Sequence, residues 1–288
     1  MAIYTLGSIN IDHVYQVPHL PRPGETLAAT DYVQGLGGKG ANQSVAAAKA
    51  GARVFHIGAI GTDAAWTLEA LQRHGVDTSN VTQIKTPTGH AIIQLDPQAE
   101  NCITLFPGAN RQISDAMAAR ALASARPEDT LLMQNETSAQ SSTVRLAADM
   151  GLRILYSPAP FDLTALQEVM AYTSLLLMNE GEAAEMVDAF GALPDCDVII
   201  TRGADGAEWH SPKAEPLFMR AFPVTALDTT GAGDCFAGTI AAALDAGLSP
   251  EQALRRASAA AALQVTRLGA AAAMPTAAEV DMFLQTAP

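Results

Sequence analysis

The sequence predicts an α/β fold with a mainly parallel central sheet, helices on both faces and a small β-sheet lid. Apolar, β-prone runs alternate with longer alanine-rich segments of helical period over most of the 288 residues, a pattern typical of parallel strands joined by helices. Two stretches, about 12–34 and 84–107, break this alternation with short β-prone runs and turn residues. We therefore expect one domain spanning residues 1–288, with the lid strands inserted at these two stretches.

The first strand is predicted at residues 2–9, an apolar run that ends in polar residues and suits a buried parallel strand. The other strands of the central sheet are predicted at the apolar runs 53–60, 130–134, 153–157, 174–178 and 197–201. Helices are predicted where apolar residues recur at helical spacing: 39–50, 64–75, 113–124, 139–150, 180–190, 233–246, 250–267 and 276–285.

The two lid stretches carry their own strand signals. The first is rich in proline and ends in a β-prone run at about 26–33. The second places the runs 89–95 and 102–106 on either side of a polar turn, which is typical of a hairpin. These strands can pair into a second, small sheet.

The composition disfavours several classes of protein. A hydrophobic content of 49% supports a substantial core, and a formal net charge of −13 argues against nucleic-acid or anionic-membrane partners, because phosphate contacts need clustered cations. Cys102, Cys196 and Cys235 are scattered, which favours reduced thiols over a disulfide framework or a metal site. No signal peptide or membrane-spanning stretch is expected, so we predict a soluble, cytoplasmic protein.

Polar residues follow or end several predicted strands. Because ligands of open α/β sheets bind at the carboxyl ends of the strands, these residues mark a candidate site at that edge. They are Asn10, Glu136, Asn179 and Thr201.

A glycine-rich turn at residues 35–42 contains the pattern G-x-G-x-x-G. A dinucleotide fingerprint would follow the first strand directly and be answered by an acidic residue about twenty positions later, where this chain has the apolar run 55–60. A Walker A loop is excluded because Lys39 is followed by Gly40 rather than Ser or Thr. The turn instead lets its backbone, Lys39 and Asn42 approach a small polar ligand, unless it is a plain helix start with a solvated lysine.

The stretch 228–238 combines an anion site with a candidate base. Gly231, Ala232 and Gly233 precede a predicted helix, where free N–H groups and the positive end of the helix dipole attract an anion. Asp234 lies in the first turn of that helix. It either caps the helix or accepts a proton from a hydroxyl group beside the anion.

Together these two motifs resemble the two signatures of the ribokinase-like (PfkB) family of carbohydrate kinases. The resemblance covers nearly the whole chain and implies the ribokinase-like fold. The first signature is matched at 35–42 and 57–63 and the second at 228–238, with segments similar to the family's N-x-x-E and nucleotide-loop segments between them, at 179–182 and 201–206. Segments 8–12, 37–43, 107–110 and 134–136 favour the ribokinase branch of the family.

The resemblance implies an ATP-dependent sugar kinase that phosphorylates the primary hydroxyl of a small sugar, with D-ribose giving ribose 5-phosphate as the first choice. Asp234 would be the base, and the N–H groups of Gly231, Ala232, Gly233 and Asp234 would hold the γ-phosphoryl group. The residues assigned to the sugar hydroxyls are Asn10, Asp12, Gly38, Lys39, Asn42, Glu136 and Asp234. Those assigned to ATP are Asn179, Thr201, Gly203, Ala204, Gly206 and Gly233.

Two cations are also implied by the resemblance. Asn179 and Glu182 resemble residues that organise Mg²⁺ through waters, although both also suit a helix N-terminal cap. A K⁺ ion would be bound by Asp228 and by the carbonyl oxygens of Thr230, Gln264 and Gly269. The family has a side-chain oxygen near the position of Ala273, so we expect weaker activation by K⁺ in this chain.

Other activities are compatible with the same motifs. The acceptor could be a nucleoside, fructose or another sugar, although an aromatic content of only 5% disfavours a base pocket. A non-catalytic sugar-binding protein is disfavoured by the intact motif 231–234. We expect a homodimer formed through the lid.

Overall fold

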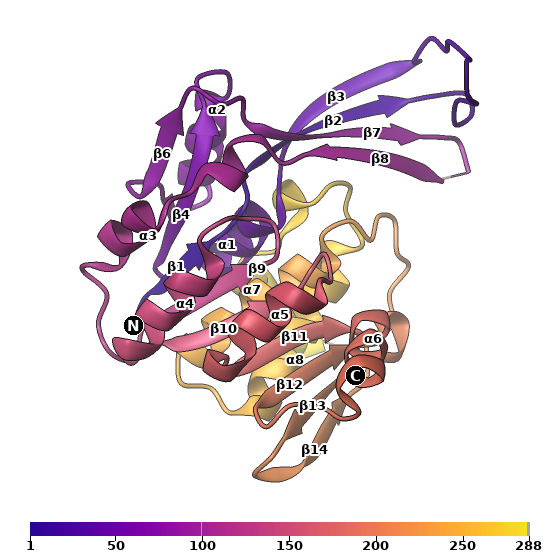
Figure 1. Ribbon diagram of the computed structural model, residues 1–288. Coiled ribbons are helices and arrows are strands. Elements are labelled where there is room, and N and C mark those ends of the chain that lie inside the picture. The colour runs from indigo at the N-terminus through magenta and orange to yellow at the C-terminus, as the bar shows by residue number, and fades with distance from the viewer. Residues whose placement is uncertain (99, 287–288) are drawn as a thin grey trace.

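The computed structural model describes residues 1–98 and 100–286, which form two sheets of different size (Figure 1). The large sheet has ten strands in the order β14-β13-β12-β11-β10-β9-β1-β4-β5, with β6 also paired to β4. Its parallel centre consists of β1 (Ile3–Leu6), β4 (Val54–Gly61), β9 (Thr130–Gln134), β10 (Arg153–Ser157), β11 (Leu175–Asn179) and β12 (Asp197–Thr201). The predicted mainly parallel sheet is confirmed.

Both edges of the large sheet extend beyond the predicted strands. At one edge the short strands β5 (Val76–Asp77) and β6 (Val81–Ile84) pair with β4. At the other, β13 (Ala207–Ser211) and β14 (Ala214–Met219) form an antiparallel hairpin against β12. These strands are short or largely exposed, so they lack the apolar runs by which buried strands are recognised.

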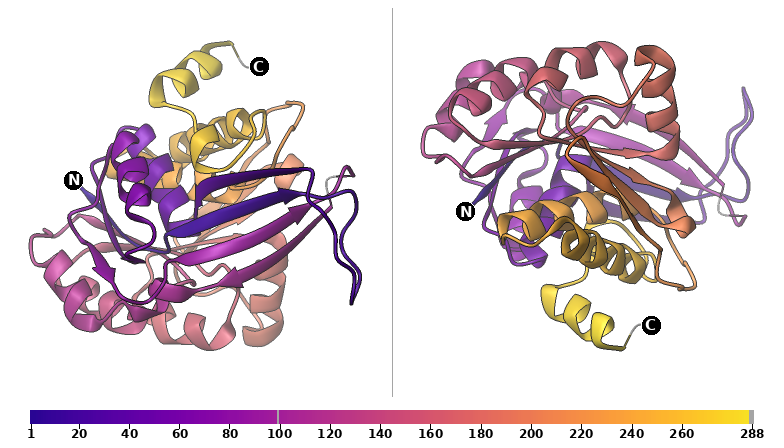
Figure 2. Two further views of the ribbon diagram at one scale, coloured as in Figure 1. Left: turned by 90° about the horizontal axis from the view of Figure 1, so that it is seen from above. Right: turned by 90° about the horizontal axis from the view of Figure 1, so that it is seen from below.

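Helices cover both faces of the large sheet (Figure 2). One hydrophobic cluster lies under α1 (Lys39–Lys49), α2 (Ala65–Arg73), α7 (Ala232–Asp245), α8 (Pro250–Gln264) and α9 (Ala277–Thr286). The other lies under α3 (Asp115–Leu122), α4 (Gln140–Asp149), α5 (Leu163–Val169) and α6 (Glu180–Phe190). Successive side chains of β9 alternate between the clusters, with Leu131 in one and Leu132 in the other, as the strand period requires. No described helix is long and apolar enough to cross a bilayer.

The lid sheet contains β3 (Asp31–Gly37), β2 (Asn10–Gln16), β7 (Gly89–Leu95) and β8 (Asn101–Phe106), in that order, and projects from the body of the molecule (Figure 1). Both predicted stretches contribute strands. The first strand was predicted too long, because β1 ends at Leu6 and Asn10 already begins β2. The intervening residues pass close to the start of α1, where a Cβ on Gly40 would overlap the backbone of Gly7.

Candidate active site

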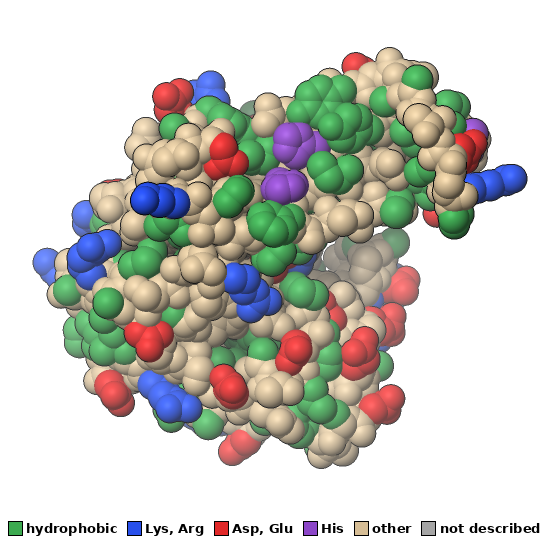
Figure 3. Space-filling model, turned by 45° about the horizontal axis from the view of Figure 1, so that its top comes forward, with side chains coloured by type: hydrophobic (Ala, Val, Ile, Leu, Met, Phe, Trp, Pro, Cys, Tyr) green, Lys and Arg blue, Asp and Glu red, His purple; other side chains and the backbone are tan. Residues whose placement is uncertain are grey.

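A cavity of about 420 Å³ opens at the carboxyl ends of β10, β11 and β12, beside the start of α7. The space-filling view shows a hollow between the projecting lid and the body (Figure 3). Eight predicted site residues line the cavity: Lys39, Asn179, Glu182, Thr201, Gly231, Ala232, Gly233 and Asp234. The glycine-rich turn and the second motif, far apart in sequence, therefore meet at one site.

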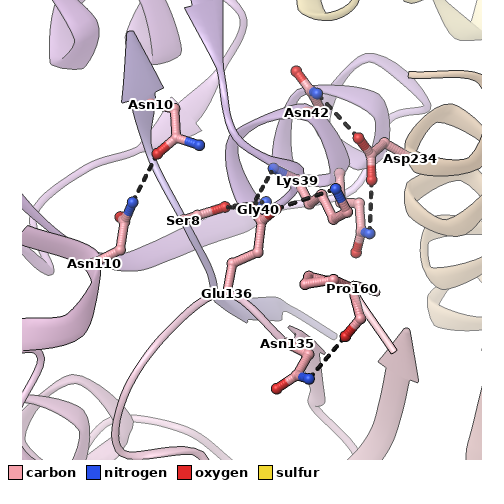
Figure 4. Close-up of polar contacts among 11 residues, drawn as sticks. Ser8, Asn10, Lys39, Gly40, Asn42, Asn110, Asn135, Glu136, Pro160 and Asp234 are labelled. Carbon is pink, nitrogen blue, oxygen red and sulfur yellow. Dashed lines mark hydrogen bonds and ion pairs between the residues drawn. The ribbon is translucent and has the colours of Figure 1, made fainter. Parts of the chain in front are cut away.

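The carboxylate of Asp234 is held by two amide donors from α1 (Figure 4). Asn42 Nδ2 donates to Oδ2 at 3.0 Å, and Gln43 Nε2 donates to Oδ1 at 3.0 Å. Gln134 Nε2 donates to Gln43 Oε1 at 2.7 Å, which fixes the orientation of the Gln43 amide. Asp234 does not cap its own helix, because the N-cap of α7 is Gly231 and has no side-chain hydrogen bond. Its carboxylate instead faces the side chains of Asn42 and Gln43 on α1.

Burial raises the pKa of Asp234 to about 6. Lys39 and the two amide donors act in the opposite direction, because each stabilises the ionised carboxylate, while Glu136 adds to the rise. A carboxylate with a pKa near 6 is a stronger base than an ordinary Asp and is still ionised at neutral pH. This combination suits a general base.

The start of α7 offers backbone donors beside Asp234. The N–H groups of Gly233 and Asp234 donate to no acceptor among the described residues, whereas Ala232 N–H donates to Thr229 O at 3.1 Å. The predicted anion site therefore has two free donors in the helix, and Ala232 N–H is already engaged. Gly231 adopts φ +79°, a left-handed conformation that favours glycine at the turn into the helix.

Lys39 and Glu136 form an ion pair near the base, with Lys39 Nζ 3.1 Å from Glu136 Oε1 (Figure 4). Glu136 Oε2 also accepts from Ser8 Oγ and, at 3.3 Å, from the Lys39 backbone N–H. Burial lowers the pKa of Lys39, but Glu136 and Asp234 outweigh it, so the net shift is upward. Lys39 is therefore an ion-paired cation on the cavity wall, with 35% of its side chain exposed.

The lid contributes Asn10 and Asp12. Asn10 Oδ1 accepts from Asn110 Nδ2 at 2.8 Å, and Asn10 is 4% exposed. Asp12 lies over Gly37, where a Cβ would overlap its carboxylate, and the described residues provide no hydrogen bond to its side chain. Burial raises the pKa of Asp12 to about 6, with further contributions from Glu136 and Asp234 against the opposing effect of Lys39. A half-buried carboxylate without a protein donor is suited to ligand hydroxyl groups.

The remaining predicted sugar residue, Gly38, has φ +94° at the N-cap of α1. A Cβ at this position would lie 2.8 Å from Ser8 O, so the turn requires glycine for its backbone geometry.

The predictions assigned no site role to Ser8, Gln43 or Asn110, which hold Glu136, Asp234 and Asn10, respectively. One signal for Gln43 was available. Asn42, Gln43 and Ser44 are three consecutive polar residues in an alanine-rich helix, and all three are buried. Buried polar side chains need partners, so such a run indicates a polar network beneath the helix.

Asn179 and Glu182 form a capping box at the start of α6. Glu182 N–H donates to Asn179 Oδ1 at 2.9 Å, and Asn179 N–H donates to Glu182 Oε2 at 2.8 Å. Glu182 Oε1 has no such role, and Glu182 also lines the cavity. Mg²⁺ retains waters and needs only one or two carboxylates plus substrate phosphates, so this single carboxylate fits a water-mediated site. No cluster of three acidic, histidine or cysteine ligands occurs in the part of the chain that the structure describes.

The predicted nucleotide loop only partly reaches the cavity. Thr201, at the end of β12, lines it, but Gly203, Ala204 and Gly206 do not. Gly203 and Ala204 belong to an exposed 3₁₀ turn (Gly203–Asp205), and Gly206 O accepts from Arg202 N–H at 2.8 Å. These three residues follow Thr201 in the sequence but do not line the cavity.

The residues predicted to bind K⁺ do not fit a cation in this structure. Gln264 Nε2 donates to the carbonyl oxygens of Thr230 and Gly269 at 2.7 and 3.1 Å. The two carboxylate oxygens of Asp228 accept from the N–H groups of Thr230 and Gly269 at 2.9 and 2.8 Å. The carbonyl oxygen of Gln264 accepts from Arg267 N–H at 3.0 Å. Oxygens of all four predicted ligands are thus hydrogen-bonded within the protein.

Comparison with known proteins identifies the family of the chain. The model of the pfkB family carbohydrate kinases matches residues 2–277. A ribokinase of Haemophilus influenzae is 37% identical over 98% of this chain and 98% of its own length. The crystal structure of a Thermotoga maritima ribokinase has a TM-score of 0.88 at 34% identity, covering 99% of this chain and 100% of that one.

An Arabidopsis thaliana ribokinase complexed with ribose and ATP has a TM-score of 0.87 at 27% identity, covering 99% of each chain. The match thus extends over the large sheet, the lid and both motifs. The chain belongs to the pfkB family of carbohydrate kinases.

Proposed function

We propose that the protein transfers the γ-phosphoryl group of ATP to the primary hydroxyl of D-ribose, giving ribose 5-phosphate. The observation that carries this proposal is the position of Asp234, a carboxylate held by two amides beside free N–H groups at the start of α7. Two relatives named as ribokinases, which match 98% and 99% of this chain, support ribose as the acceptor.

In the proposed reaction, Asp234 accepts the proton of the primary hydroxyl as its oxygen forms a bond to the γ-phosphorus atom. The bond between that phosphorus and the β,γ-bridging oxygen breaks, and ADP leaves with the electron pair. The N–H groups of Gly233 and Asp234 stabilise negative charge on the transferring phosphoryl group, aided by the dipole of α7. Lys39, held by Glu136, adds a fixed positive charge nearby.

The sugar is proposed to bind between lid and body. Asp12 and Asn10 approach from the lid strand β2, and Glu136, Asn42 and the turn at Gly38 approach from the body. Carboxylate and amide oxygens accept from ribose hydroxyl groups, and amide N–H groups donate to them. The lid and body together form the unit that we propose as a single functional domain.

We propose ATP and Mg²⁺ as cofactors. Thr201 and Gly233 line the cavity that would receive the ATP phosphates, beside Asn179, and Gly203, Ala204 and Gly206 extend from it toward the nucleoside. Mg²⁺ would neutralise phosphate charge, and Glu182 is the residue that would hold it through water. The K⁺ that the resemblance also implied would have to displace the Gln264 amide from its two carbonyl acceptors.

The acceptor can be identified directly. The protein should be incubated with ATP·Mg²⁺ and a panel containing D-ribose, 2-deoxyribose, fructose, other pentoses and a nucleoside, and the products should be identified by mass and by the position of the phosphate. We expect the highest kcat/KM with D-ribose and a 5-phosphate product. A higher kcat/KM with another acceptor would replace ribose, and binding without turnover would indicate a non-catalytic sugar-binding protein.

We also propose a homodimer formed through the lid. His13 and Tyr15 point away from the Asp12 face of β2, because successive side chains of a strand alternate. They form an aromatic group with Tyr32, His90 and Phe106, in which Tyr15–Tyr32 and His90–Phe106 ring centroids are 4.9 and 5.1 Å apart. Tyr32 and Phe106 are 47% and 45% exposed, and histidine and hydrophobic side chains gather on this face of the lid (Figure 3). Exposed aromatic groups of this kind are typical of interfaces.

Light scattering tests the dimer. We expect twice the chain mass for the native protein and a single chain mass for Tyr32→Glu. A monomeric native protein would exclude the proposed dimer. We propose a cytoplasmic location, consistent with the free thiols of Cys102, Cys196 and Cys235.

A further inference from the structure

Gln264, the last residue of α8, links two loops beside the anion site. Its side chain is fully buried at 0% exposure. Its Nε2 donates to Thr230 O at 2.7 Å and to Gly269 O at 3.1 Å. Thr230 directly precedes Gly231, at the turn into the helix whose N–H groups face the cavity. One amide group therefore joins the anion-site loop to the segment that follows α8.

The hydrogen-bond network determines which way the Gln264 amide points. In the reverse orientation Oε1 would face two carbonyl oxygens, and three acceptors would meet without a donor. In the observed orientation both hydrogens of the NH₂ group have acceptors. The partly positive NH₂ group thus occupies the position between Thr230 O and Gly269 O, where a bound cation would attract the same two oxygens.

The other positions of the predicted K⁺ site also lack free oxygen ligands for a cation. Residues 269–273 carry no side-chain oxygen, and the buried Ala273 stands where one was expected. Both carboxylate oxygens of Asp228 accept backbone N–H groups from the same two loops. Of these two bonds, the one from Gly269 N–H joins the loops, and Val265 O also accepts from the N–H groups of Leu227 and Asp228. Hydrogen bonds within the protein therefore hold the two loops together.

The segment joined by Gln264 packs directly on the turn that begins α7. A Cβ placed on Gly231 would lie 2.9 Å from the Cβ of Ala270 and 3.3 Å from its Cα. Movement of residues 269–270 would therefore move Gly231 and the N–H groups that follow it. A group that fixes this contact fixes the geometry in which the transferring phosphoryl group is bound.

We propose that the side-chain amide of Gln264 takes the place of a monovalent cation, so that the enzyme reaches full activity without K⁺. Gln264 is a positioning residue that acts through Thr230 and Gly269 and touches no substrate. The proposal rests on the proposed kinase function. It departs from the prediction of weaker K⁺ activation, because the amide already supplies the contacts that an ion would make.

The kinetic test compares the native enzyme with Gln264→Ala. The rate should be measured while KCl replaces choline chloride at constant ionic strength, with kcat and the two KM values determined separately. For the native enzyme we expect kcat to change by less than about twofold over the titration. For Gln264→Ala we expect kcat to fall about tenfold or more without K⁺ and to recover as K⁺ fills the vacated position, because loss of one or two hydrogen bonds is of that order.

A second measurement does not depend on catalysis. The Tm of each protein should be compared in KCl and in choline chloride, without substrates. A ligand that binds only the folded state raises its stability, so Gln264→Ala should show a rise in Tm with K⁺ and the native protein should not. Gln252→Ala is the matched control, because it removes the same side chain at the other end of α8, where it completes the capping box of Ser249. It should lower Tm equally in both salts.

Some results would overturn the proposal. Activation of the native enzyme by K⁺ of about tenfold or more, with a rise in its Tm, would mean that the amide turns over and presents Oε1, which has no partner among the described residues, as a cation ligand. If Gln264→Ala does not fold, Gln264→Glu places a carboxylate against the two carbonyl oxygens and must then show a K⁺-dependent Tm. A Tm that does not change with K⁺ in either Gln264→Ala or Gln264→Glu would also refute the proposal. If no sugar is phosphorylated in any salt, the proposed function fails, and the Tm comparison still decides the role of Gln264.

Discussion

Replacing Asp234 by asparagine tests the base with little change in shape. The introduced side chain can keep its oxygen toward Gln43, whose amide is fixed by Gln134. Its NH₂ group would then face Asn42, and Asn42 Oδ1, which has no partner among the described residues, can rotate to accept from it. Both contacts with α1 can therefore be retained while the negative charge and the proton acceptor are removed.

The expected loss in Asp234→Asn is in turnover. General-base catalysis contributes about 10²–10⁴-fold, so kcat should fall by that factor while the KM for the sugar changes by less than about threefold. In the native enzyme kcat should rise about tenfold per pH unit below pH 6 and level off above it, because Asp234, with a pKa of about 6, must be ionised to accept the proton. The measure is kcat because Asp12, whose pKa is also raised to about 6, would affect kcat/KM through sugar binding. The residual rate of the variant should lack this dependence.

The same substitution should stabilise the fold at high pH. The folded-state pKa of about 6 lies above the ordinary value of 3.8, so the native protein loses stability as pH rises between these values. The full difference corresponds to about 3 kcal/mol at most, and to less in practice because the side chain is partly exposed. Asp234→Asn should therefore raise Tm at pH 8 and leave it nearly unchanged at pH 4.

Asp245→Asn is the matched control. Asp245 ends the same helix, and burial also raises its pKa, but it lies away from the cavity lining. We expect its kcat to equal that of the native enzyme. Turnover close to native in Asp234→Asn would refute the assignment of the base, and an equal change in Tm at pH 4 and pH 8 would refute the charge argument.

Three further substitutions separate the other roles. Glu182→Gln keeps an acceptor for the Asn179 N–H but removes the charge, so Tm should stay constant while the Mg²⁺ concentration needed for half-maximal rate rises; an unchanged Mg²⁺ titration would leave Glu182 as a cap only. Asp12→Ala should weaken ribose binding by about 1–3 kcal/mol, which would appear as a higher KM for ribose with an unchanged KM for ATP. An equal rise in both KM values would assign Asp12 to lid closure. Gly40→Ala should destabilise the fold by about 1–3 kcal/mol or more in urea unfolding, because the new Cβ overlaps the backbone of Gly7, whereas Gly35→Ala, with no atom within 4 Å, should unfold like the native protein.

The elements that the sequence predicted well are those with a clear hydrophobic period. The parallel strands and most helices were predicted within a few residues, because buried strands are continuous apolar runs and covering helices have one apolar face. The helix α5 and the hairpin of β13 and β14 were missed. The hairpin is held by pairing to the edge of the large sheet, and its largely exposed side chains carry no apolar pattern.

The candidate site was predicted less completely than the fold. Asp234, Lys39 and Glu136 carry charges in motifs and could be named from the sequence. Gln43 could not be paired with Asp234, since that contact depends on how α1 packs against α7, 191 residues further along the chain. The Gln264 bridge was missed for the same reason, and the residue was assigned for its backbone carbonyl instead of its side chain.

The charges around the cavity bear on the acceptor. Asp12, Glu136 and Asp234 interact electrostatically with one another and with Lys39. Among the described residues that line the cavity, Lys39 is the only one with a cationic side chain. With all groups ionised the four carry a net charge of −2, and the ammonium of Lys39 is already paired with Glu136 at 3.1 Å. A phosphate group on the acceptor would meet repulsion from these carboxylates at low effective dielectric. A neutral sugar avoids that repulsion and supplies hydroxyl donors to the same oxygens, so sugar phosphates should be poor acceptors even where they fit the cavity.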